Sequence, residues 1–136
     1  MANIPTDTLV ADHFRAKAAA YASPMTIEAW IKGGKSDFVL VDVRIPSPQL
    51  TWRIPGSAAI PTDKMEQRFA ELPKDKLIVL YCWDTWCSLA TTSALILLGH
   101  GYRVKELFGG VAAWKTLHLP EEIVPAAEAA SAGYAC

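Results

Sequence analysis

Short apolar runs alternate with segments of helical periodicity along most of this chain. Apolar runs of the kind that form buried strands cover residues 38–43 and 77–81, and further short strands are expected over 57–60 and 103–107. Apolar residues spaced three and four apart predict helices over 8–21, 27–32, 62–72, 88–98 and 111–117. Strands that alternate with helices favour a parallel sheet covered on both faces. We therefore predict an α/β fold with a mainly parallel sheet of about five strands and helices on both faces.

The 136 residues are enough for one domain with extensions at either end. We predict an N-terminal helical extension over 1–24, a domain over 25–120 and a loose, alanine-rich C-terminal tail over 121–136. The Ser23-Pro24 pair is expected to end the first helix, and Thr26 is expected to cap the second.

Charge and hydropathy exclude several classes of partner. The net charge is −1 and no basic cluster is present, which argues against nucleic acid as a ligand. No apolar stretch approaches the roughly 20 residues that span a bilayer, and the first residues lack the pattern of a secretory signal. We therefore expect a cytoplasmic protein with no membrane partner, whose thiols are mostly reduced.

Cys82 is the first candidate for chemistry. It directly follows the apolar run 77–81, and a helix is expected to begin a few residues later. Open α/β sheets bind ligands at the carboxyl ends of their strands. The N–H groups at a helix start favour an anion, and they favour a thiolate over a thiol. This placement predicts a nucleophilic cysteine that acts on a small anionic substrate.

Five segments, taken together and in order, resemble the motifs of a rhodanese-like domain. They are Leu40–Arg44 (LVDVR), Ile54–Pro61 (IPGSAAIP), Val79–Cys82 (VLYC), Leu98–Val104 (LGHGYRV) and Leu107–Trp114 (LFGGVAAW). The likeness covers about residues 25–120 and implies a rhodanese-like α/β fold.

The resemblance also implies a reaction and a set of roles. The Cys82 thiolate would take a sulfur atom from a small anionic donor such as thiosulfate, as a persulfide, and pass it to a thiophilic acceptor such as cyanide or a thiol-bearing acceptor protein. No cofactor is implied. Asp42 and Arg44 would support the site by charge-assisted hydrogen bonds. The loop that binds the donor through its N–H groups would comprise Trp83, Asp84, Thr85, Trp86, Cys87 and Ser88.

The loop departs from the family pattern in its charge and flexibility. Residues 83–87 contain no glycine and no Lys or Arg, and Asp84 has the wrong sign to stabilise a thiolate, a persulfide or an anionic donor. Arg53 stands where the family usually has a histidine and could approach the mouth of the loop. Phosphatases and arsenate reductases also place a cysteine before an anion-binding loop, but they need a loop arginine that this chain lacks.

Cys87 leaves several alternatives open. It could resolve an oxidised or persulfidated Cys82 as a disulfide, act as the nucleophile itself, or simply pack. A non-catalytic or redox-sensing module that uses a Cys82–Cys87 dithiol is therefore the alternative function. Two cysteines with no third ligand nearby fall short of a metal site, so none is expected. Cys136 could pair with another chain under oxidation.

Two loop tryptophans, Trp83 and Trp86, need an explanation of their own. Loop tips seldom carry two tryptophans unless these cover something. They could shield the site from water, or form a docking patch for a protein partner. Both interpretations remain open at this point.

Overall fold

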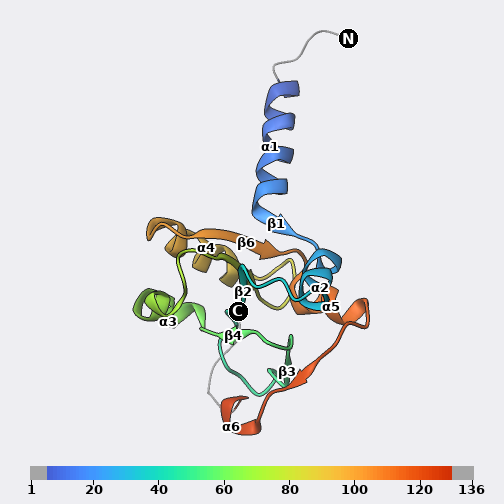
Figure 1. Cartoon of the computed structure of the whole chain (residues 1–136), viewed down its shortest axis with the longest axis vertical. Helices are drawn as coiled ribbons and strands as arrows, with labels where there is room; N and C mark the ends of the chain where they lie inside the picture. Colours follow the sequence, from blue (N-terminus) through green and yellow to red (C-terminus); the bar gives the residue numbers. More distant parts are fainter. Residues whose placement is uncertain (1–5, 130–136) are drawn as a thin grey trace.

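A parallel five-stranded sheet forms the centre of the molecule, in a computed structural model that describes residues 6–129 (Figure 1). The strand order is β1-β6-β5-β2-β4, and every pair in this sheet is parallel. The strands are β1 (Tyr21–Ala22), β2 (Phe38–Asp42), β4 (Ala58–Ala59), β5 (Leu77–Tyr81) and β6 (Arg103–Leu107). The α/β architecture predicted from the alternating pattern is confirmed.

Helices cover both faces of this sheet. One face is covered by α3 (Thr62–Arg68), continued by the 3₁₀ turn η1 (Phe69–Glu71), and by α4 (Leu89–Gly99). The other face is covered by α2 (Pro24–Lys32) and α5 (Gly110–Thr116), while α1 (Thr6–Ala20) precedes β1. The pleat of β5 explains the two layers, because successive side chains point to opposite faces. Ile78 and Leu80 pack with Met65 of α3, while Val79 packs with Trp114 of α5. Because both faces are covered, the middle strand β5 is apolar along its whole length.

The register of β2 against β5 positions the candidate site. Asp42 lies opposite Tyr81, so both strands end at the same level. The N–H group of Val43 then donates to the carbonyl oxygen of Tyr81 at 3.1 Å and extends this pairing by one residue. Residues that follow the two strands consequently leave the sheet side by side.

The start of α2 differs from the sequence expectation. Its N-cap is Ser23, whose side chain accepts a hydrogen bond from the Thr26 N–H group at 3.1 Å, and Pro24 occupies the first helical turn. Thr26 is therefore inside the helix rather than its cap. Proline suits this position because the first N–H groups of a helix have no intrahelical partner.

The beginning of the expected loose tail is folded onto the domain. Strand β7 (Glu122–Ile123) pairs antiparallel with β3 (Trp52–Arg53) and leads into the short helix α6 (Ala126–Ala129). Val124 and Ala129 are buried and form a small cluster with Leu50. The segment 121–129 thus differs from the expectation, whereas 130–136, including Cys136, lie outside the described residues.

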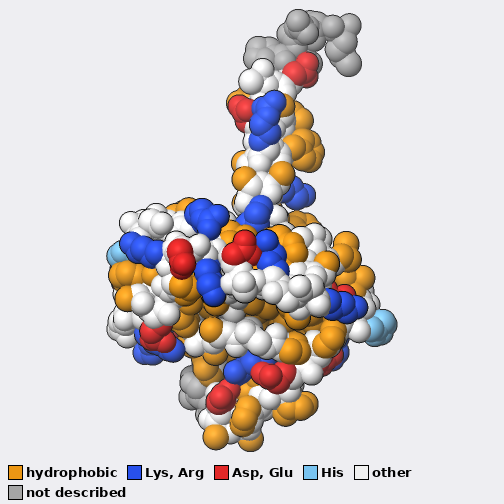
Figure 2. All heavy atoms as spheres, in the orientation of Figure 1, with side chains coloured by type: hydrophobic (Ala, Val, Ile, Leu, Met, Phe, Trp, Pro, Cys, Tyr) orange, Lys and Arg blue, Asp and Glu red, His pale blue; other side chains and the backbone are white. Residues whose placement is uncertain are grey.

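Helix α1 projects from the rest of the molecule (Figures 1 and 2). Its apolar side chains Leu9, Val10 and Phe14 are 66, 51 and 60 % exposed. At its base, the Lys105 ammonium group donates to the carbonyl oxygens of Ala18 and Ala19, both at 2.9 Å. Within residues 6–129, no helix combines the length and the apolarity that crossing a membrane requires.

Candidate active site

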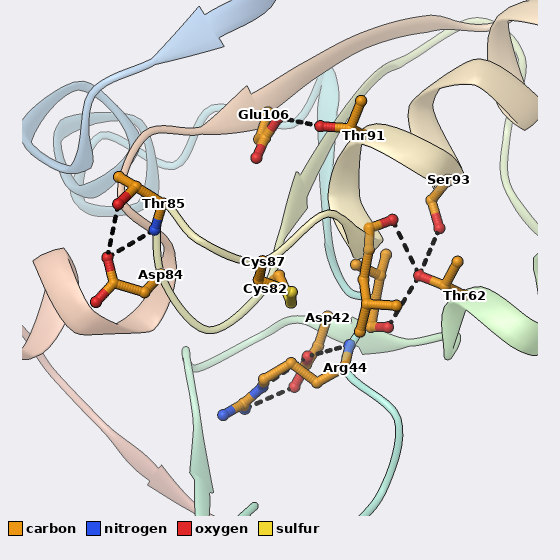
Figure 3. Close-up of a disulfide and its surroundings, with 12 residues drawn as sticks. Asp42, Arg44, Thr62, Cys82, Asp84, Thr85, Cys87, Thr91, Ser93 and Glu106 are labelled. Carbon is orange, nitrogen blue, oxygen red and sulfur yellow. Dashed lines mark hydrogen bonds and ion pairs between the residues drawn. A yellow bond between two sulfur atoms is a disulfide. The ribbon is translucent and has the colours of Figure 1, made fainter. Parts of the chain in front are cut away.

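Cys82 directly follows β5 and opens the loop that leads to α4. The side chains of Cys82 and Cys87 are buried, at 3 and 6 % exposure. Their sulfur atoms are joined in a disulfide, with Sγ–Sγ 2.14 Å and Cα–Cα 6.5 Å (Figure 3). The sequence left the relation of these two residues open. The structure brings them together and closes the loop between them.

Asp84 organises the loop from inside. Its Oδ1 accepts the Thr85 N–H group at 2.6 Å and the Thr85 hydroxyl at 3.2 Å, while its carbonyl oxygen accepts the Cys87 N–H group at 3.1 Å. The carboxylate thus supplies an internal acceptor where an anionic ligand would supply one. In this oxidised form, two N–H groups of the loop are used within the loop itself.

The absence of glycine from the loop is explained by its backbone. Among the described non-glycine residues, only His118 has a positive φ. The residues between Cys82 and Ser88 therefore turn without entering the left-handed region, and no glycine is needed there. Ser88 occupies the N-cap position of α4 and is exposed, and its carbonyl oxygen accepts the Thr92 N–H group at 3.0 Å.

Helix α5 holds the backbone of the loop from the other side. The N–H groups of Val111 and Ala112 donate to the carbonyl oxygens of Cys82 and Trp83, both at 3.0 Å. Gly110 permits this approach, because an added Cβ would lie 2.5 Å from the Cys82 carbonyl oxygen, and its φ is +56°. The sequence analysis did not assign Gly110 to the site, although the LFGG motif contained the signal.

Asp42 and Arg44 form a buried ion pair under the loop (Figure 3). The Arg44 Nε and Nη2 groups donate to the two Asp42 carboxylate oxygens at 2.9 and 2.8 Å, and Nη2 also donates to the Trp52 carbonyl oxygen at 2.7 Å. The guanidinium carbon lies 4.6 Å from the centre of the Trp83 ring. Arg44 thereby connects the end of β2 and the first residue of β3 with the residue after Cys82.

Tyr81 is the last residue of β5, directly before Cys82, and its side chain is buried. Its hydroxyl accepts the Ile54 N–H group at 3.2 Å and lies 2.8 Å from the Ser57 hydroxyl. Burial, followed by the nearby Asp42 charge, raises the pKa of Tyr81 well above its usual range. Tyr81 is accordingly a neutral structural donor and acceptor.

Thr62 anchors the beginning of α4, a role that the sequence analysis missed. Its hydroxyl lies 2.9 Å from the Ser93 hydroxyl and donates toward the carbonyl oxygens of Leu89 and Val43 at 3.1 and 3.2 Å. Both hydroxyls lie at buried positions, so these bonds fix α4 against the end of β2.

The two loop tryptophans occupy different environments. Trp83 is half-buried, packs against the buried clusters on both sides of the sheet and also contacts the Leu50 cluster. Trp86 is 67 % exposed. Trp83 is thus part of the packing around the disulfide, whereas Trp86 presents an aromatic surface to solvent.

A cavity of about 220 Å³ lies at the carboxyl ends of β2 and β4. Arg53, which the sequence allowed to approach the mouth of the loop, lines this cavity and forms an ion pair with Glu128 of α6. Arg68 and Glu128 line it as well, and the sequence analysis named neither. Across residues 6–129, no group of three or more His, Cys, Asp or Glu side chains could hold a metal ion.

Comparison with known proteins identifies the class to which this fold and site belong. Residues 23–117 match the family model of the rhodanese-like domain. Because this match covers more than half of the chain, the chain belongs to the rhodanese-like domain family. The resemblance and the fold inferred from the five sequence motifs are therefore confirmed.

Individual relatives agree with this assignment. A protein of Allochromatium vinosum named sulfurtransferase is 36% identical over 84 residues, which cover 62% of this chain and 78% of the relative. A Bacillus halodurans structure is 31% identical with a TM-score of 0.77 and 85% of each chain covered. A Lactobacillus plantarum structure is 28% identical with a TM-score of 0.81, covering 88% of this chain and 99% of that one.

Proposed function

We propose that this protein is a sulfurtransferase that carries sulfur as a persulfide on Cys82. The observation that carries the proposal is the position of Cys82, buried directly after the central strand β5 of a rhodanese-like domain. The relative named sulfurtransferase supports it. The donor is thiosulfate or a similar anion with a sulfane sulfur, and the acceptor is a thiophile such as cyanide or a protein thiol.

The reaction has two displacement steps. The Cys82 thiolate attacks the outer sulfur of thiosulfate, the bond between the two donor sulfurs breaks, and sulfite leaves with the electron pair. The acceptor thiolate or cyanide then attacks the terminal sulfur of the persulfide and regenerates the Cys82 thiolate. The disulfide described above is an oxidised form, so a thiol reductant must first release both cysteines. A cytoplasmic location, where thiols are kept reduced, would supply that reductant.

A redox module is the second candidate, and the disulfide itself favours it. In this role the Cys87 thiolate attacks the inner sulfur of a Cys82 persulfide, forms the disulfide and expels hydrosulfide. Two electrons from a thiol reductant would then restore the dithiol. The lack of a basic residue in loop 83–87 also favours this candidate, because such a residue would stabilise the anionic donor.

Intact mass spectrometry of the reduced protein after mixing with thiosulfate tests both candidates. We expect the wild type and Cys87→Ser to gain one sulfur atom and Cys82→Ser to gain none. Cys136→Ser is the control, because it removes the remaining thiol without touching the loop. Loss of the gain only in Cys87→Ser would make Cys87 the nucleophile. No gain in the wild type, with loss of two hydrogens on mild oxidation, would leave the redox module.

A further inference from the structure

Three guanidinium groups converge on the 220 Å³ cavity beside the loop. It lies between the chain after β2, the end of β4, helix α3 and helix α6. The charged side chains that line it are Arg44, Arg53, Arg68, Asp42 and Glu128. A cavity with more cationic than anionic side chains is suited to an anion.

Two of these guanidinium groups carry N–H donors without an acceptor. Nη1 of Arg44 and Nε of Arg53 are buried and have no hydrogen-bond partner among residues 6–129. The Arg44 side chain is 0 % exposed, so this donor cannot turn to bulk solvent. A buried donor without an acceptor is costly, whereas an oxoanion offers several acceptor oxygens to arginine.

The other charges around the cavity have defined partners. Asp42 is engaged by two nitrogens of Arg44, and Arg68 donates to the two Glu71 carboxylate oxygens at 2.7 and 2.9 Å. Glu128 also has a partner, Arg53, but this ion pair joins segments 75 residues apart and the Glu128 side chain remains 53% exposed. It sits on α6, a helix of four residues. Because Glu128 is half in solvent and sits on a short helix, its carboxylate can give up its place beside Arg53 to another anion.

The cavity is also connected to the residue after the candidate nucleophile. Arg44 lies against the ring of Trp83, and Trp83 in turn contacts the cluster that contains Ala129 of α6. An anion that displaces Glu128 would therefore act on side chains that touch the active loop. This connection places positive charge beside a loop that has none of its own.

We propose that this cavity binds a small oxoanion or sulfonate through Arg53, Arg44 and Arg68, and that Glu128 is its internal competitor. The carboxylate occupies the site when no ligand is present and leaves Arg53 when the anion binds. Identifying this anion with the sulfur donor rests on the proposed function. The anion site itself does not, because it requires no cysteine chemistry.

Titration of the reduced, full-length protein with sodium sulfate tests the site. Tryptophan fluorescence reports binding, and sodium chloride keeps the ionic strength constant. We expect Glu128→Gln to bind sulfate about threefold more tightly than the wild type, and Arg53→Gln about tenfold more weakly. Glu121→Gln is the matched control for Glu128, because it removes a carboxylate from the same segment that pairs with Lys115 instead. Arg15→Gln on α1 is the control for Arg53.

Two results would overturn the proposal. One is sulfate affinity in Glu128→Gln that equals the affinity of Glu121→Gln. The other is affinity in Arg53→Gln that equals that of Arg15→Gln. If near-ultraviolet circular dichroism shows that Arg53→Gln is unfolded, Arg68→Gln replaces it, because Arg68 lines the cavity and is more exposed.

The test is independent of sulfur transfer. Sulfate has no sulfane sulfur, so it cannot form a persulfide. Sulfate binding without a gain of sulfur from thiosulfate would uphold the anion site and reject the proposed function. A gain of sulfur without sulfate binding would uphold the proposed function and reject the anion site.

Discussion

Two ion pairs lie near the cysteine loop, one in the floor of the site and one at its rim, and they differ in how far they are buried. The floor consists of Asp42, Arg44 and Gly110, all buried, with the two carboxylate oxygens and two guanidinium nitrogens matched in parallel. The rim consists of Arg53 and Glu128, where the carboxylate is half in solvent. The difference indicates that the Asp42–Arg44 pair must stay intact for the chain to fold, because neither charge can be rehydrated. The Arg53–Glu128 pair can instead open in solvent and make room for a ligand.

Removal of the floor carboxylate should have the largest effect. Asp42→Asn leaves the Arg44 guanidinium buried without a counter-charge, and we expect the free energy of unfolding to fall by about 3–5 kcal/mol. Urea denaturation measures it. Asp37→Asn is the control, since this carboxylate precedes the same strand but pairs with Lys35 in solvent. Similar losses in both variants would abolish the distinction between floor and rim.

Gly110→Ala should have the next largest effect. The new Cβ would meet the Cys82 carbonyl oxygen at 2.5 Å, and φ is +56°, so we expect a loss of about 3 kcal/mol. Gly56→Ala separates the two causes, because its φ is +79° but an added Cβ has nothing within 4 Å. That control should cost only about 1 kcal/mol. Equal losses in urea would mean that close approach to the loop contributes nothing.

Tyr81→Phe should weaken the support beneath the floor by about 1 kcal/mol, since the Ile54 N–H group loses its acceptor. The raised pKa of Tyr81 adds a pH dependence. The unfolded chain releases the tyrosine proton near pH 10 and the folded chain only above that, so this stability contribution is lost as pH rises past about 10. The difference between wild type and Tyr81→Phe in urea should shrink there. A constant difference would contradict a raised pKa.

At the rim, Glu128→Gln should change the free energy of unfolding by less than about 1 kcal/mol. A pair that is half in solvent gains little from its attraction, and any gain is screened by salt. Thermal melts at low and high salt, with Glu121→Gln beside it, measure this. A loss as large as that of Asp42→Asn would assign the Arg53 pair to the floor instead.

The smallest effect is a local one on Glu71. The hydrogen bonds from Arg68 hold the pKa of the Glu71 carboxyl below its usual range, against a weaker opposite effect of burial. In Arg68→Gln we expect this pKa to return toward its ordinary value. Carboxyl NMR titration measures the shift directly. No movement of the Glu71 resonance would contradict the hydrogen bonds from Arg68 to Glu71.

The sequence predicted the central strands better than the periphery. The expected bounds of β5 and β6 match the structure. The apolar run Leu77–Tyr81 indicated the buried strand β5, whereas β6 carries Arg103, Lys105 and Glu106 and was placed by its position after the α4 helix. The strands β3 and β7 have two residues each and were missed. Their pairing joins segments distant in the chain, and no local pattern encodes such a contact.

In the candidate site, too, the sequence predicted the residues with a local signal and missed the contacts between distant segments. The position of Cys82 after β5 followed from the strand alone, and Asp42 and Arg44 followed from the family resemblance. The ion pair between Arg53 and Glu128 spans 75 residues and left no signal near either residue. Gly110 is intermediate, since its motif was noted but its reason, the closeness of the Cys82 carbonyl, is visible only in three dimensions.

Helices α1 and α6 differ in how well they would serve to attach this protein to a surface or a reporter. Figure 1 places α1 and α6 at opposite ends of the molecule. A fusion or immobilisation through the amino-terminal helix would leave α6, which helps to line the arginine cavity, at the end of the molecule away from the support. Shortening the chain to end at Pro120 would instead delete Glu128, which lines the arginine cavity, together with Val124 and Ala129, whose cluster packs against Trp83.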